Sequence, residues 1–424
     1  MTIFRKQLTI EIMKNQGKLI VFILSIFTLF NCSKDENNAA PNQAPEAFTL
    51  IAVTDGAIGV DVKPTFSWNA AVDPEGDTIT YELLMDANSN PTTSIANNIS
   101  GTSFTLQDRL PLTVSRFWKV MATDNAGNTS MSNTFSFTTR NLSIPTTPVT
   151  ANAAFSERLA HASIVFDGKM WVIGGIDNSA LNDVWNSPDG ENWTEVTSNA
   201  GFSERSSHTS VVFDNKIWVI GGLDEGIRKN DVWSSPDGIT WTAVTASAPF
   251  SARYSHTSVV LDNKIWVIAG EDGIRKNDVW SSPDGITWTE ATASAPFSAR
   301  AAHTSVVFDN KIWVIAGYDD IRKNDVWNSP DGVTWTAVNA SAPFSARYSH
   351  TSVVFDNKIW VIAGLDGNYK NDVWSSPDGI TWTEATASAP FSERYSHSFV
   401  VFDNKIWVIA GYDGFLKNDV WSMD

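Results

Sequence analysis

The sequence is poor in cysteine, histidine and basic residues, and each shortage excludes a class of protein. Its 424 residues include one Cys and six His. A single cysteine cannot form a disulfide framework within the chain or a cysteine-rich zinc site. Lys and Arg total 30 against 47 Asp and Glu, which gives a formal net charge of −17. This acidic balance argues against a nucleic-acid partner.

The apolar run nearest the N-terminus, residues 19–30, is too short to span a membrane. Its 12 residues would extend about 18 Å as a helix, against a bilayer core of about 30 Å. Lys14 and Lys18 precede it, so the pattern is typical of a secretory signal. We expect a signal peptide over residues 1–31, the alternative being a short buried helix. The start could be Met1 or Met13.

The cysteine follows this run directly, in the sequence Leu29-Phe30-Asn31-Cys32. It resembles the lipobox of bacterial lipoproteins, although Asn31 stands where a small residue is usual. The resemblance implies lipidation of Cys32 and a membrane anchor, followed by a polar tether over residues 32–44. An acidic stretch just after the cysteine resembles the surface-export signals of Bacteroidetes-type lipoproteins. We therefore expect an exported protein, lipid-anchored at the outer membrane or cell surface.

Residues 45–142 show short alternating strands separated by turns, a pattern that predicts an all-β sandwich. Trp68 and Trp118 are expected to fill its core. The segment resembles a fibronectin type III or immunoglobulin-like module through residues 64–68, 73–77 and 118–120, and such modules are mostly spacers. The turn with Asp73, Glu75 and Asp77 could bind calcium, because carboxylates suit a hard cation, or could be a plain solvated turn.

The remaining chain, residues 146–424, is a sixfold repeat. All six histidines recur at intervals of 47 or 48 residues, each three residues after an arginine. The arginines mark repeats that start near residues 158, 205, 253, 300, 347 and 394; the histidines are His161, His208, His256, His303, His350 and His397. Six histidines around a channel could in principle bind a transition metal. Because each histidine is locked to its repeat, we favour a structural role, with no metal and no cofactor.

One repeat predicts four antiparallel strands, near residues 256–261, 264–268, 277–280 and 287–289. Asp262-Asn263 suits a tight hairpin, and four such strands buried on both faces describe a propeller blade. The unit resembles the kelch repeat, with Gly174-Gly175 and Gly221-Gly222 in the first two copies and Ala-Gly in copies three to six. Its Ser-Pro-Asp-Gly turns resemble the Asp-box. The sequence thus predicts an all-β chain, with a six-bladed propeller after the sandwich.

The sixth copy ends at Asp424 without a fourth strand. One period before the fourth strand of the first copy lie residues 146–152. We expect this N-terminal strand to complete the last blade and close the ring.

Differences between the copies gather on the face that carries the links from strand four to strand one and from strand two to strand three. Loops on a rigid scaffold are where recognition usually occurs. The candidate binding residues are Arg228, Tyr254, Arg275, Arg322, Tyr348, Tyr369, Tyr395 and Phe415. Neutral drift after duplication is the alternative explanation.

The pattern favours a monomeric, non-catalytic module that binds a glycan or a protein through this variable face. We assign no catalytic residue, because catalysis needs an asymmetric site and the blades are nearly uniform. Glu225 and Glu271 are specific to single blades, and they keep open a kelch-type carbohydrate-active enzyme such as a sugar epimerase, mutarotase or lyase. An envelope scaffold is the third possibility.

Overall fold

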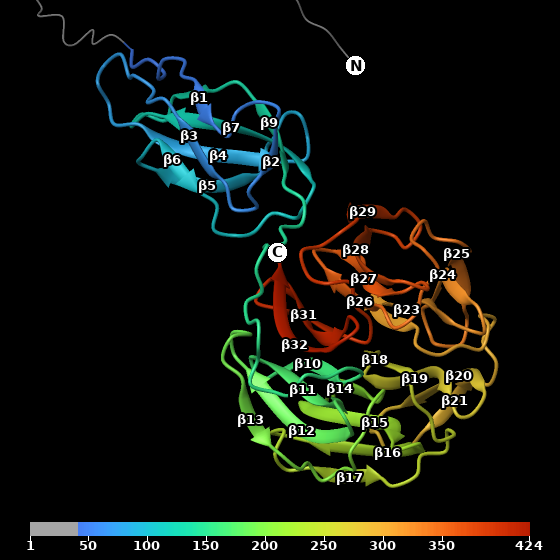
Figure 1. The fold of residues 1–424 in the computed structure, drawn as a ribbon. Coiled ribbons are helices and arrows are strands. Elements are labelled where there is room, and N and C mark those ends of the chain that lie inside the picture. The colour runs from blue at the N-terminus through green and yellow to red at the C-terminus, as the bar shows by residue number, and fades with distance from the viewer. Residues whose placement is uncertain (1–40) are drawn as a thin grey trace, which may run out of the picture.

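The computed structural model describes residues 41–424, which form two all-β parts joined by a short linker (Figure 1). Every regular element in this range is a β-strand. The expected signal peptide, Cys32 and most of the expected tether lie outside the described residues. Within the described range, no helix has the length and apolar character needed to cross a membrane.

The N-terminal part is a β-sandwich of two sheets. One sheet has the order β1-β3-β6 and the other β2-β9-β7-β4-β5, with β8 paired to β7. Phe66, Trp68 and Trp118 are buried between the sheets, as predicted for the two tryptophans. The strands are β1 (Leu50–Ala52), β2 (Ala57–Val60), β3 (Thr65–Trp68), β4 (Thr80–Asp86), β5 (Ser94–Ile99), β6 (Ser103–Thr105), β7 (Ser115–Thr123), β8 (Thr129–Met131) and β9 (Phe135–Thr139).

The C-terminal part is a ring of six antiparallel sheets, the six predicted blades. Blades one to three contain β10 (Ala162–Phe166), β11 (Lys169–Ile176), β12 (Ala180–Ser187), β13 (Thr194–Thr197), β14 (Thr209–Phe213), β15 (Lys216–Asp224), β16 (Ile227–Ser235), β17 (Thr242–Thr245), β18 (Thr257–Leu261), β19 (Lys264–Glu271), β20 (Arg275–Ser282) and β21 (Thr289–Thr292). Blades four to six contain β22 (Thr304–Phe308), β23 (Lys311–Tyr318), β24 (Arg322–Ser329), β25 (Thr336–Asn339), β26 (Thr351–Phe355), β27 (Lys358–Leu365), β28 (Tyr369–Ser376), β29 (Thr383–Thr386), β30 (Ser398–Phe402), β31 (Lys405–Tyr412) and β32 (Leu416–Met423). The innermost strands contact one another around the ring, and β10 contacts β30.

The last blade is closed by the N-terminal side of the propeller, as predicted. Thr150 pairs with Val420 of β32, and the Val420 N–H donates to the Thr150 carbonyl at 2.8 Å. The closing segment is a single bridge rather than the full outer strand predicted over residues 146–152. Pro148 explains the difference, because it stands opposite Trp421 in the repeat register and has no N–H to donate. A second backbone pair joins Ser143 to Asp424.

Neighbouring blades interlock through a tryptophan and a glycine. The glycine of each Asp-box-like turn lies so close to the strand-two tryptophan of the preceding blade that a Cβ would overlap the indole; Gly285 and Trp218 are one such pair. Five tryptophans are covered in this way: Trp171, Trp218, Trp266, Trp313 and Trp407. The sixth, Trp360, faces blade six, which ends before such a turn.

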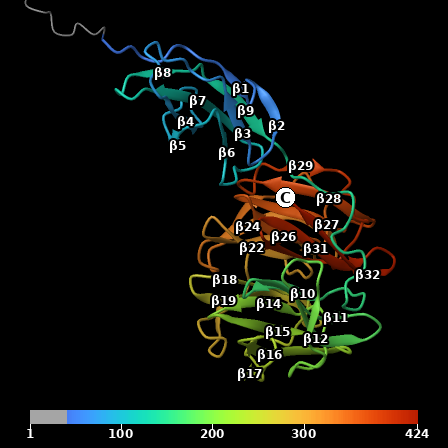
Figure 2. The same ribbon diagram turned by 90° about the vertical axis from the view of Figure 1, so that its left-hand side faces the viewer.

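The sandwich lies beside Trp360, where the other blades have a turn glycine over the tryptophan. Trp360 is 1% exposed and belongs to a hydrophobic cluster that includes Val62 and Leu112 of the sandwich. Asp356, in the hairpin turn between β26 and β27, accepts a hydrogen bond from the Leu112 N–H at 2.6 Å and pairs with Arg109 at 2.8 Å. Figures 1 and 2 show the sandwich against the last blades, coloured orange and red. The sandwich is therefore docked on the propeller.

Candidate functional site

The arginine three residues before each histidine is a buried structural group. In the third repeat Arg253 is 0% exposed, and its guanidinium donates to both carboxylate oxygens of Asp278 at 2.7 Å. Its other three N–H groups donate to the carbonyls of Ser251 and Ala269 and to the Ser251 hydroxyl. All five donors are thus satisfied within the blade, and the same ion pair recurs in all six blades.

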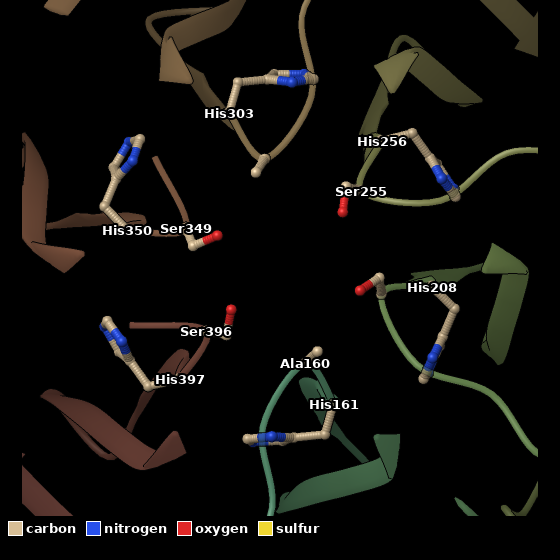
Figure 3. Close-up of a pocket in the computed structure, with 12 residues that line it drawn as sticks. Ala160, His161, His208, Ser255, His256, His303, Ser349, His350, Ser396 and His397 are labelled. Atoms are coloured by element: carbon tan, nitrogen blue, oxygen red, sulfur yellow. The ribbon is translucent and has the colours of Figure 1, made fainter. Parts of the chain in front are cut away.

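The six histidines surround the central channel, where their rings lie along its circumference (Figure 3). Five of them place Nε2 within hydrogen-bond distance of a hydroxyl in the preceding blade, as His303 does with Thr257 at 2.9 Å. His208 has no such partner, because Ala162 stands where the other blades have Thr or Ser.

The histidines remain neutral at physiological pH. Burial, followed by the charge of the neighbouring arginine, lowers the pKa of His161, His208, His256 and His350 to about 3. The same causes hold the pKa values of His303 and His397 well below 6.5. Among residues 41–424 the one group of three potential metal-ligating side chains is Asp73, Asp77 and Asp124, in the sandwich. Within the described residues the six imidazoles thus form a neutral lining of the channel.

A closed circle of backbone hydrogen bonds narrows the channel. The residue before each histidine donates its N–H to the carbonyl of its counterpart in the preceding blade, at 2.8–3.0 Å all around the ring. These residues have φ near +50°, a conformation that few non-glycine residues adopt. They are Ala160, Ser207, Ser255, Ala302, Ser349 and Ser396. Figure 3 shows the labelled alanine and serine side chains pointing to the centre, around a cavity of about 130 Å³.

Chemical differences between the blades appear at the mouth of this channel. In each blade the residue two before the histidine forms a β-bridge with the residue after the Gly-Gly or Ala-Gly pair of the second strand. These bridges join the link from strand four to strand one with the link from strand two to strand three. The two variable links therefore lie on one face, as predicted. The six pairs are Leu159–Ile176, Ser206–Leu223, Tyr254–Glu271, Ala301–Tyr318, Tyr348–Leu365 and Tyr395–Tyr412. Blades one and two thus carry no aromatic residue in these pairs, whereas blades three to six each carry tyrosine.

Six of the seven tyrosines of the chain lie on this face. We call it the tyrosine face, defined by Tyr254, Glu271, Tyr318, Tyr348, Tyr369, Tyr395 and Tyr412, together with Arg228 and Arg275. All six tyrosines are half-buried, so each phenol ring is held by its neighbours and keeps an accessible edge or face.

Three tyrosines of blades five and six form one cluster. The ring centroids of Tyr369 and Tyr395 are 5.4 Å apart, and those of Tyr395 and Tyr412 are 5.6 Å apart. Burial, and then the neighbouring phenols, raise the pKa of Tyr395. Tilted and edge-to-face contacts at these distances are favourable and fix the rings in place.

Residues of blades three to five form a second tyrosine cluster, which also contains a charged arginine. The Arg275 guanidinium lies 4.6 Å from the Tyr318 ring centroid and pairs with Asp320 at 2.6 Å. Asp320 has φ of +89°, where the corresponding residue of blades three, five and six is glycine. A non-glycine residue is uncommon in this conformation. Tyr318 in turn packs on Tyr348 at 5.2 Å.

The polar end of the tyrosine face is in blade three. The Tyr254 hydroxyl donates to the Glu271 carboxylate at 2.9 Å. Burial and this acidic partner raise the pKa of Tyr254, while Arg228 and Arg275 oppose the rise. The Tyr254 hydroxyl, the Glu271 carboxylate and the nearby arginine guanidinium groups thus lie on one side of the channel mouth.

The structure brings together most of the residues selected from the sequence and leaves two at the edge. Arg322 is exposed, with its guanidinium beside Gly367, and Phe415 is 77% exposed at a loop tip. Tyr318 and Tyr412 were not among the residues selected from the sequence. The residue after the Gly-Gly or Ala-Gly pair differs among copies and would have indicated both positions.

Comparisons with known proteins agree with the fold. The model of the KLHDC2/KLHL20/DRC7 Kelch-repeats domain matches residues 120–317 and 282–424. Among solved structures, one titled "Structure of YjhT" is 15% identical, with a TM-score of 0.53, over 65% of this chain and 96% of that chain. That likeness supports the fold alone. A search of curated proteins found no match.

Proposed function

Because the chain belongs to the KLHDC2/KLHL20/DRC7 kelch-repeat family, whose propellers are in general binding or scaffold modules, we propose that it is a non-catalytic binding protein. Its tyrosine face would engage a glycan or a protein. The lipid on Cys32 would hold it at the outer membrane or cell surface.

The observation that carries this proposal is the asymmetric placement of aromatic residues. The blades repeat their core, their Arg–Asp pairs and their turns, yet tyrosine enters only at the mouth of blades three to six. Tyrosine offers a flat apolar surface and a hydroxyl, and few rotatable bonds become fixed when it binds. Because neighbouring rings already hold these side chains, binding would require little further ordering.

The sandwich would act as a fibronectin type III-like spacer with a fixed orientation. Its strand order, with β1-β3-β6 facing β9-β7-β4-β5, supports that family assignment. The contacts of Asp356 with Arg109 and Leu112 support a rigid junction. A rigid spacer would present the tyrosine face in one direction relative to the tether.

A second candidate, a carbohydrate-active isomerase or lyase, is favoured by the Tyr254–Glu271 pair. The Tyr254 hydroxyl lies 2.9 Å from the Glu271 carboxylate, so the phenol could donate a proton to a bound sugar while Glu271 accepts one. Glu271→Gln would then abolish turnover of a bound sugar and leave its binding within a few-fold. Turnover that survives this change would exclude Glu271 as the base.

The test of the binding proposal compares two triple variants. The purified full chain is screened on a glycan array and used to capture proteins from cell envelopes. We expect the tyrosine variant to lose the ligand that the wild type retains, and the control on the opposite face to keep it. The tyrosine variant is Tyr254→Ala, Tyr348→Ala and Tyr395→Ala; the control is Ile239→Ala, Ile286→Ala and Ile380→Ala, whose side chains are exposed at repeat-equivalent turns. Equal retention by both variants would refute a site on the tyrosine face, and one constant partner held by both would favour a scaffold.

A further inference from the structure

Two turns meet at the tip of the sandwich, where the described chain begins. The first connects β3 to β4, and Asp73 Oδ1 accepts the N–H groups of Glu75 and Asp77 at 3.0 and 2.9 Å. The second connects β7 to β8, and Asp124 Oδ1 accepts the N–H groups of Ala126 and Asn128 at 2.8 and 2.9 Å. Each turn thus uses one oxygen of its first aspartate to fix the loop.

Three carboxylates are concentrated between these turns. One oxygen each from Asp73, Asp77 and Asp124 lies within 4.8 Å of the others. Asp73 and Asp124 are only 7% and 6% exposed. Asp73 Oδ2 is buried and has no hydrogen-bond partner among the described residues. A buried carboxylate oxygen without a donor is rare, because it has given up water without compensation.

We propose that Asp73, Asp77 and Asp124 bind one Ca²⁺ ion. The donors are all oxygens, which Ca²⁺ prefers, whereas a zinc site would use histidine or cysteine. Two oxygens on one Ca²⁺ ion can be up to about 5 Å apart, twice a Ca–O distance of about 2.3–2.6 Å, which matches the spread of the three oxygens. The ion would also offset the mutual repulsion of three negative charges.

Hydrogen bonds from neighbouring side chains hold the Asp124 carboxylate in place. Asn42 and Asn128 donate their side-chain amides to Asp124 Oδ2 at 2.7 and 2.9 Å. Together with the turn N–H groups on Oδ1, these amides fix the orientation of the Asp124 carboxylate beside Asp73 and Asp77.

The geometry corrects the ligand set expected from the sequence. Glu75 does not join the cluster; its carboxylate accepts both the backbone and the side-chain N–H of Gln43 at 3.1 Å. Asp124 takes its place from a turn about 50 residues further along the chain. Because Asn42 and Gln43 both contact this tip, Ca²⁺ would fasten the end of the tether to the sandwich and set the direction in which the chain leaves it.

The test is titration of the EDTA-treated full chain with Ca²⁺ alone, followed by calorimetry. We expect one site with a dissociation constant of about 10⁻⁴–10⁻³ M, in the range of extracellular modules, and binding of Mg²⁺ at least about tenfold weaker. Asp73→Asn and Asp77→Asn should each weaken Ca²⁺ binding at least about tenfold. Glu75→Gln, in the same turn, should leave binding within about twofold and is the matched control.

Asp77→Asn guards against a folding artefact, because Asp73 then keeps both of its turn hydrogen bonds. Circular dichroism melts of each variant without calcium give the second readout. Calcium should raise the melting temperature of the wild type and of Glu75→Gln, but not that of a folded Asp77→Asn. The proposal is overturned if the wild type binds no calcium at millimolar concentration, or if all variants bind it equally.

Discussion

Replacing Asp278 with alanine should lower the free energy of unfolding of the propeller by about 3–5 kcal/mol, the usual effect of removing one partner of a buried ion pair. The change removes two hydrogen bonds from Arg253 and one from the Trp280 indole N–H. Arg253 has no solvent exposure, so its guanidinium would stay buried and charged with no carboxylate beside it. That penalty is a large fraction of the stability of a typical domain, about 5–15 kcal/mol.

Urea unfolding followed by tryptophan fluorescence measures this loss. All but two of the 19 tryptophans, Trp68 and Trp118, lie in the propeller, so the signal reports mainly on the ring. With a denaturant slope of about 3 kcal/mol per molar, the midpoint should fall by about 1 M or more. Glu290→Ala, an exposed carboxylate in the same blade, should change stability by less than about 0.5 kcal/mol.

The six blades provide an internal comparison. Asp325→Ala, the same change one blade later, should cause the same loss, because Arg300 makes the same contacts there. The structural account of these pairs fails if either alanine variant loses less than about 1 kcal/mol. It also fails if one variant abolishes ligand binding while its stability is unchanged.

Three further predictions concern packing, docking and pH. Gly285→Ala should destabilise the propeller by about 2 kcal/mol or more in the same urea assay, because the new methyl overlaps Trp218 and φ is +72°; unchanged stability would contradict the interlocking of the blades. Asp356→Ala should release the sandwich, seen as faster proteolysis between the domains, whereas Asp309→Ala at the same repeat position should not; equal proteolysis would refute the docking. As the pH falls from about 6.5 towards 3, the histidines of the unfolded chain take up protons and those of the folded chain do not. The free energy of unfolding should therefore drop by up to about 1.4 kcal/mol per pH unit for each histidine. A melting temperature that stays flat between about pH 7 and 5 would contradict buried neutral histidines.

The blades could be predicted from the sequence because each is specified locally, by turns and apolar runs inside one 47-residue unit. The histidine period also indicated a structural role, since a repeated residue has a repeated environment. What escaped prediction depends on contacts between units. Asp356 stands in the same Phe-Asp-Asn-Lys turn as Asp214, Asp309 and Asp403, and only the docked sandwich distinguishes it.

The candidate site was predicted in part for the same reason. Tyr254, Tyr348 and Tyr395 were found because aligned copies differ in the link before the histidine. Tyr318 and Tyr412 were missed, although the residue after the Gly-Gly or Ala-Gly pair varies among the copies. Their place at the channel mouth follows from the bridge that each forms with the neighbouring link. Asp124 belongs to a turn distant in sequence from Asp73, and its proximity is a result of sandwich topology.

We propose that this propeller binds its ligand through the tyrosine face. The decisive measurement is the dissociation constant of the ligand retained by the wild type, determined by calorimetry for the two triple variants. Each tyrosine anchor is expected to contribute about 1–2 kcal/mol, so the tyrosine variant should bind at least about 100-fold more weakly, and the isoleucine control within about twofold. Loss of binding in the isoleucine variant, with the tyrosine variant unaffected, would place the site on the opposite face and contradict the account.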